Sequence, residues 1–279
     1  MVVWIASRVD TAKLQTMVGD AEWGWLVLAA LLVPVQILLA SWRWRRISND
    51  LGLPLSRWQA TSEFGLSTLL NQILPGGIAG DAIRVWRHRS GHGTLGGPLR
   101  AAVVDRVVGH VAHVAVTAFG LILWVFVHPT PPPQMAWVIV GAITAGLVYV
   151  WFWPIPGLRR VIADAHTILT GWRQICEHTT VSIVLVGLFL LCFWCCAQAL
   201  HLPLGFGVLT AVPLLMLALV LPISIGGWGL REVSATAVLG TLGWSVESSV
   251  ALSAAYGVVN LAGASPAALV LLRTPRSTQ

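Results

Sequence analysis

Residues 71–84 read NQILPGGIAGDAIR, in which one proline and three glycines lie inside an apolar segment that ends in two opposite charges. Proline and glycine interrupt a helix and leave backbone amide and carbonyl groups without intrahelical partners. At the depth of a lipid bilayer such groups are tolerated only where protein or a polar cavity surrounds them. We therefore expect a broken helix here, beside a polar cavity if the chain lies in a membrane.

The composition indicates a polytopic membrane protein. Only 10% of the 279 residues are charged and 56% are hydrophobic, whereas soluble domains have about a quarter charged residues. The net charge of +6 comes from short loops between apolar segments, which argues against nucleic acid as a partner. The four cysteines lack the spacing of a zinc site or a disulfide scaffold. We expect all four, three of which lie inside an apolar stretch, to pack as small apolar side chains, and we expect no metal site and no cofactor.

Six uncharged stretches have the length of about 20 residues that a helix needs to cross the hydrocarbon core. They are Trp23–Trp42, Val107–Val127, Met135–Trp153, Val181–Leu200, Phe206–Ile223 and Ser248–Leu272. Fourteen of the 17 basic residues lie in segments 43–57, 84–106 and 154–180 and in the C-terminal tail, whereas connections 128–134 and 201–205 hold none. Because basic loops stay on the cytoplasmic side, we expect these segments and the C-terminus there.

The same charge distribution predicts that residues 58–83 and 206–246 each return to the side from which they enter. Such re-entrant hairpins with broken helices, one from each face, are typical of inverted repeats. The first would hold a helix of about Arg57–Leu74. For the second stretch the alternative is that Phe206–Ile223 and Val233–Val246 both cross the membrane, which leaves the final topology unchanged. The expected helix breaks are at Pro75, Gly76, Gly77 and Gly80, and at Pro222, Gly226, Gly227 and Gly229.

The expected fold is an all-α polytopic membrane protein with about six spanning helices and two opposed re-entrant hairpins, arranged as an inverted repeat. Residues 1–279 form a single transmembrane domain in this interpretation. The hairpins, at about 58–83 and 206–246, belong to its first and second halves.

Polar residues flank the first break. Asn71 precedes it, while Asp81 and Arg84 follow it at a spacing that puts both on one face of a helix. We expect them to line a pocket for a lipid headgroup, with Arg84 binding phosphate. The structural alternative is that Asp81 is the N-cap of the next helix.

The second break is followed directly by Arg231 and Glu232, between two apolar segments. Ionisable groups at membrane depth are costly and usually face an aqueous cavity or a substrate path. We therefore expect both to lie in the substrate path. The alternative is that they neutralise each other and that Glu232 accepts free amides at the start of a helix.

No motif of a hydrolase, metalloprotease or nucleotide-binding loop occurs in the sequence. We therefore expect no catalytic residues and no enzymatic activity of this chain alone.

Four motifs in order resemble one family of membrane proteins. They are RWRR (43–46), NQILPGGIAGDAIR (71–84), VDRVVG (104–109) and PISIGGWGLRE (222–232). This pattern is similar to the transmembrane, flippase-like region of lysylphosphatidylglycerol synthases and its stand-alone relatives, and the likeness covers nearly the whole chain. The expected substrate-binding residues are Asn71, Asp81, Arg84, Arg106, Arg231 and Glu232, and all of them except Arg231 match positions of the family's motifs. Where the family has a basic residue after Pro-Gly, this chain has Gly77.

The resemblance further implies a multi-pass protein of the bacterial inner membrane that moves or binds a phosphate-containing lipid, whether aminoacylated, polyprenyl or hopanoid-related. The expected partners are lipids with anionic or zwitterionic headgroups, a separate lipid-modifying enzyme and a second copy of the chain. The soluble aminoacyl-transfer domain of the synthases is absent from this sequence, and Met1–Ala6 resembles the end of a further span, so we expect the true start to lie upstream. The alternative function is a membrane-embedded subunit or scaffold of an enzyme such as a polyprenyl-phosphate glycosyltransferase.

Overall fold

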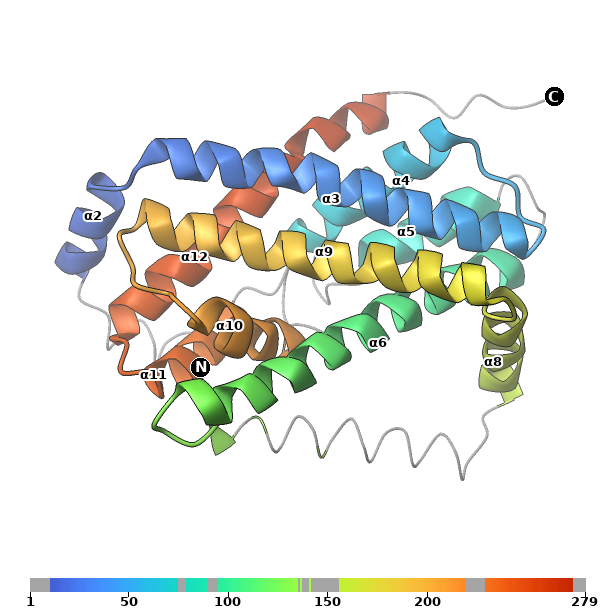
Figure 1. Cartoon of the computed structure of the whole chain (residues 1–279). Helices are drawn as coiled ribbons and strands as arrows, with labels where there is room; N and C mark the ends of the chain where they lie inside the picture. The colour runs from blue at the N-terminus through green and yellow to red at the C-terminus, as the bar shows by residue number, and fades with distance from the viewer. Residues whose placement is uncertain are drawn as a thin grey trace.

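The computed structural model describes residues 11–74, 79–89, 95–134, 136, 141, 156–218 and 229–272. Within these ranges every named element is a helix (Figure 1). The elements are α2 (Thr11–Gly19), α3 (Trp23–Asp50), α4 (Arg57–Ile73), α5 (Ala79–Arg89), α6 (Gly96–Val127), α8 (Pro156–Ile168), α9 (Trp172–Ala199), α10 (Gly207–Ala218), α11 (Leu230–Gly240), α12 (Val246–Ala264) and the 3-10 helix η1 (Ser265–Leu272).

Four of the described helical segments are long and apolar enough to cross a membrane. They are α3, α6, α9 and the continuous segment Val246–Val270, with 28, 32, 28 and 25 residues. Each exceeds the about 20 residues that the hydrocarbon core requires. These segments contain most of four of the six expected spans. Met135–Trp153 lies almost wholly outside the described residues. Of Phe206–Ile223, residues 219–223 also lie outside them, and the described part forms the 12-residue helix α10.

The outer faces of the long helices are apolar. Leu31 on α3 is 62% exposed and Phe126 on α6 is 81% exposed, and further exposed large apolar side chains lie on α9. Water is a poor solvent for so large an apolar surface, whereas lipid acyl chains match it.

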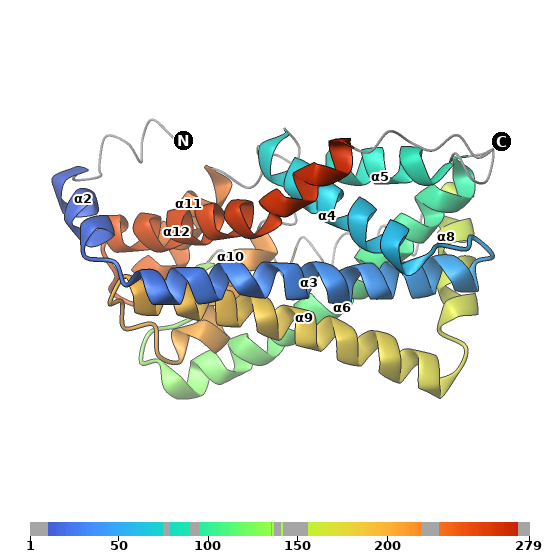
Figure 2. The same cartoon turned by 90° about the horizontal axis from the view of Figure 1, so that it is seen from above.

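Two pairs of short helices fill the space between the long ones. Helix α4 packs against α5, and α10 packs against α11. The first pair lies toward the end of the bundle where α3 ends, and the second toward the opposite end (Figures 1 and 2). Helix α4 ends at Ile73, one residue before the expected Leu74. The expected breaks at Pro75, Gly76, Gly77, Pro222, Gly226 and Gly227 fall outside the described residues.

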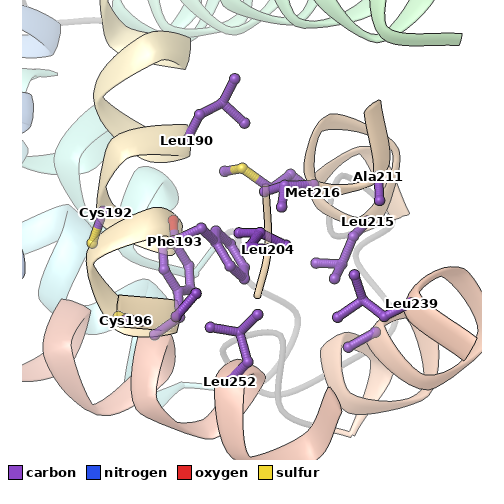
Figure 3. Packing of buried hydrophobic residues seen from close by; sticks show 14 of the residues in the cluster. Leu190, Cys192, Phe193, Cys196, Leu204, Ala211, Leu215, Met216, Leu239 and Leu252 are labelled. Atoms are coloured by element: carbon purple, nitrogen blue, oxygen red, sulfur yellow. The ribbon is translucent and has the colours of Figure 1, made fainter. Parts of the chain in front are cut away.

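The largest apolar core joins the long helices to the second pair. Phe193 of α9, Leu215 of α10, Leu239 of α11 and Leu252 of α12 point toward one another there (Figure 3). Cysteines 192, 195 and 196 are fully buried free thiols in this region, which confirms that they act as small packing residues. The core fixes α11 against α12 and so positions the charges at the start of α11.

Candidate functional site

Asp81 is the centre of a polar network between α4, α5 and α6. Its Oδ1 accepts a hydrogen bond from Ser67 Oγ at 3.1 Å and lies 2.9 Å from Arg84 Nη2. Its Oδ2 accepts from Asn71 Nδ2 at 3.1 Å and from Arg106 Nε at 3.0 Å. Arg106 Nη2 contacts the same oxygen. One carboxylate thus connects three helices.

The start of α5 explains how Asp81 comes to face α4. The helix begins at Ala79, so Asp81 lies in its first turn and is not the N-cap. Asn71 supplies a capping acceptor instead, because its Oδ1 accepts the Gly80 amide at 2.8 Å. A Cβ at Gly80 would lie 2.9 Å from that same oxygen and still closer to the Ser67 carbonyl. Only glycine therefore allows this approach of α5 to α4.

A second ion pair links three of the long helices. Arg43 on α3 donates from Nε to Asp105 Oδ1 at 2.9 Å, and from Nη1 to Ser182 Oγ on α9 at 2.8 Å. Its Nη2 also donates to the Asp105 carbonyl at 3.2 Å. The guanidinium lies over Gly109, where a Cβ would be 2.9 Å from Nη2. Because α3 continues to Asp50, Arg43 is a buried residue of a helix and not part of a loop, which corrects the expectation for this residue.

Arg84 lies between these two groups and is the most deeply buried of the three arginines. Its side chain is 1% exposed. Its guanidinium carbon lies 4.4 Å from the centre of the Trp44 ring and 4.6 Å from that of Phe64. Its Nη1 is 3.8 Å from Asp105 Oδ2, beyond hydrogen-bond distance. Within the described residues, neither its Nε nor its Nη1 has a hydrogen-bond acceptor.

The charges after the second break form a closed network. Glu232 Oε2 accepts the Gly229 amide at 2.5 Å, and its Oε1 accepts from Arg231 Nη2 at 3.2 Å. Ser253 Oγ on α12 donates to the same Oε1 at 3.0 Å. Gly229 has a φ of 83°, a left-handed conformation that favours glycine. This geometry matches the alternative in which the pair is neutralised and Glu232 caps the helix.

Two adjoining cavities bring most of these groups together. The first, of about 310 Å³, is lined by both aspartates and by the three arginines of α3, α5 and α6. The second, of about 290 Å³, is lined by Arg231, Gln36, Gln72, Tyr256 and Asn260. Both cavities share Asn71 and four neighbouring residues as walls. A polar space thus extends from the first short helix pair to the second.

An apolar groove adjoins the second cavity. It has a volume of about 320 Å³ and is lined by residues of α3, α4, α12 and η1. Ile37 borders both spaces. Trp58 and Leu269 on the groove are 61% and 64% exposed, so the groove lies at the outer apolar surface.

The family model of the lysylphosphatidylglycerol synthase TM region matches residues 1–267. The chain belongs to this family. The resemblance seen in the sequence is thereby confirmed, and the protein is a membrane protein related to lipid handling. No curated protein and no solved structure matches the chain significantly.

In this family member, the structure brings together four of the residues singled out in the sequence. Asn71, Asp81, Arg84 and Arg106 all line the first cavity. Arg231 lines the second cavity. Glu232, 11% exposed, pairs with Arg231 and is not among the residues that line either cavity.

The sequence did not single out Arg43 and Asp105 as site residues, although a signal for Arg43 was present. The buried positions of α3 include Ala29, Val33, Ala40, Arg43 and Ile47. Spacings of three and four residues are those of one helical face. Arg43 therefore continues the buried stripe of a helix that extends past Trp42.

Proposed function

We propose that this protein is a non-enzymatic lipid translocase of the bacterial cytoplasmic membrane that binds a phosphate-containing headgroup in the two polar cavities. The observation that supports this most directly is Arg84, a fully buried guanidinium on a cavity wall. No described residue accepts a hydrogen bond from two of its nitrogen atoms, Nε and Nη1. Burying ionised groups is costly even when they are paired. Five of them around one cavity in membrane helices are best explained by a charged ligand.

In the proposed mechanism, the two short helix pairs are re-entrant hairpins that enter from opposite faces of the bilayer, and the C-terminus is cytoplasmic. A headgroup enters the first cavity, where Arg84 donates to its phosphate in the manner typical of arginine. It then passes Asn71, which borders both cavities, and reaches Arg231 in the second. Asp81 and Glu232 orient these two arginines through the ion pairs described above.

The hydrocarbon tails of the lipid need not enter the polar space. The groove beside Ile37 gives them a path along the outer surface while the headgroup occupies the adjoining cavity. Tails that stay in an apolar environment avoid the cost of exposing hydrocarbon to a polar cavity.

The proposal is tested with purified protein in vesicles that contain a fluorescent phospholipid. Translocation is measured as the fraction of lipid in the inner leaflet that becomes accessible to a membrane-impermeant quencher. We expect Arg84→Gln and Arg231→Gln each to slow translocation at least about tenfold, because each removes a charge-assisted contact to phosphate. The matched control is Arg46→Gln, since Arg46 is 46% exposed and borders neither cavity.

Unchanged translocation by a folded protein that carries both Arg84→Gln and Arg231→Gln would refute the proposal. If the variants changed only the amount of folded protein, and wild-type vesicles showed no translocation, a scaffold or enzyme-subunit role would replace it. The saturated network around Glu232 is the observation that favours this second function, because such a network also stabilises a fold without any ligand.

A further inference from the structure

The charges that line the two cavities are unequal, and this determines which headgroup they favour. Three arginines and two aspartates line the first cavity. Arg231 lines the second, with Glu232 as its partner. Among the described residues at this site, arginines therefore outnumber carboxylates by one.

Each carboxylate is already engaged by donors of the protein. Asp81 accepts from Ser67, Asn71 and Arg106 and pairs with Arg84. One Asp105 oxygen accepts from Arg43, and the other faces Arg84 Nη1 at 3.8 Å. Both oxygens of Glu232 accept hydrogen bonds as well. An ammonium group that entered the cavities would have to displace a guanidinium from its carboxylate.

Unlike the carboxylates, Arg84 has hydrogen-bonding groups that are not engaged by the described residues. Arg84 uses Nη2 for Asp81, while its Nε and Nη1 have no hydrogen-bond acceptor among the described residues. Buried donors that belong to a charged group are especially costly to leave unsatisfied. A phosphate oxygen can accept from adjacent guanidinium N–H groups in the fork geometry typical of arginine.

We infer that the cavities select a lipid whose phosphodiester headgroup has a net negative charge, and that they disfavour an aminoacylated headgroup with a net positive charge. The inference rests on the proposed function and specifies its substrate class. It separates this chain from the lipid after which its family is named. Arg84 is the residue that determines the selectivity.

The test measures which lipid remains bound to the full-length protein in mixed micelles by native mass spectrometry. The micelles contain equal amounts of phosphatidylglycerol, lysylphosphatidylglycerol and phosphatidylcholine with identical acyl chains. We expect phosphatidylglycerol to be retained over the lysylated lipid by about tenfold. Both lipids offer the same phosphodiester to Arg84, but the lysylated headgroup adds ammonium groups beside the arginines, and like charges placed together are unfavourable. Arg84→Gln should bring this ratio close to one, whereas Arg46→Gln should leave it unchanged.

Two further variants keep the test decisive if Arg84→Gln does not fold. Arg84→Lys retains the charge but loses the fork, so it should keep part of the preference. Asp81→Asn removes a carboxylate that is engaged by protein donors, so the preference for phosphatidylglycerol should persist or increase. Loss of lysylated lipid in Asp81→Asn, after substantial binding to wild type, would instead identify Asp81 as a counter-ion for ammonium and overturn the inference.

The outcomes separate this inference from the proposed function. Equal retention of phosphatidylglycerol and the lysylated lipid with depletion of phosphatidylcholine, or preference for the lysylated lipid, overturns the selectivity while lipid binding in the cavities stands. A preference that persists in Arg84→Gln overturns the role of Arg84. Equal retention of all three lipids, which is the composition of the micelle, overturns specific lipid binding altogether. Soluble glycerophosphoglycerol, which has the same headgroup without tails, should bind at least about tenfold more weakly than the lipid. Equal binding would mean that the ligand is a free phosphodiester.

Discussion

Replacing Arg43 by methionine should destabilise the protein strongly, because it leaves a buried carboxylate without its main partner. Arg43 and Asp105 have exposed side-chain fractions of 8% and 3%, and their ion pair connects α3 to α6. Methionine preserves much of the aliphatic volume of arginine, so the change chiefly removes charge and hydrogen bonds. Ser182 retains a hydrogen bond to the His178 carbonyl at 2.7 Å and is not left unsatisfied.

The magnitude follows from what remains around Asp105. Removing one partner of a buried ion pair costs about 3–5 kcal/mol, whereas breaking an exposed pair costs about 0–1 kcal/mol. Arg84 Nη1 stays 3.8 Å from Asp105 Oδ2 and compensates part of the charge. We therefore expect a loss of about 3 kcal/mol, at the lower end of that range. For Arg46→Met, which breaks an exposed pair with Asp50 at 3.7 Å, we expect a loss below about 1 kcal/mol.

The measurement is reversible unfolding in mixed micelles with increasing denaturing detergent, followed by tryptophan fluorescence. A double-mutant cycle with Asp105→Leu isolates the pair. Because the double variant contains neither buried charge, it should be more stable than Arg43→Met alone. The reasoning is refuted if Arg43→Met costs less than about 1 kcal/mol, or if the two single losses simply add in the double variant.

Three further changes test other parts of the structure. Gly80→Ala should lower stability by about 2 kcal/mol through overpacking against α4, and thermal unfolding should show no comparable loss for Gly187→Ala, where a Cβ meets nothing within 4 Å. Partial burial lowers the pKa of His128 below its ordinary value of 6.5, so the unfolded chain takes up a proton first and stability should fall as the pH drops below about 6.5. His128→Gln should weaken this dependence in melting curves recorded across this pH range. Ala267→Trp should fill the apolar groove and weaken binding of a long-chain lipid while leaving binding of its soluble headgroup unchanged, which calorimetry with both ligands would check.

The sequence predicts those parts of the fold and site that depend on neighbours along the chain. The length of apolar stretches predicts the four long helices. The spacing of Asp81 and Arg84 predicts their contact, because residues three apart share a helical face. Asn71 lies beside them because α4 packs against α5.

Contacts between distant segments could not be predicted in this way. Arg43 and Asp105 are 62 positions apart. Hydropathy alone ends the apolar stretch at Trp42, because the next residue is an arginine. Whether that arginine can be buried depends on an acidic partner in another helix, which hydropathy does not reveal. Periodicity places a residue on the buried face of its own helix, but it does not determine which helix faces it.

The two short helix pairs have comparable charges but differ in how completely their hydrogen-bonding groups are satisfied. We therefore expect them to have different roles in the proposed passage. Each second helix begins near an arginine–carboxylate pair, Asp81 with Arg84 in α5 and Arg231 with Glu232 in α11. In α11 the capping amide and Ser253 complete the coordination of the carboxylate. In α5 two buried nitrogen atoms of the arginine, Nε and Nη1, have no acceptors among the described residues. A phosphate gains the most binding free energy where hydrogen-bond donors are unsatisfied. The first cavity should therefore bind the headgroup more tightly than the second, from which it should be released more easily. Within the proposed passage, the headgroup should therefore spend most time in the first cavity, and its departure from Arg84 should be the slower step.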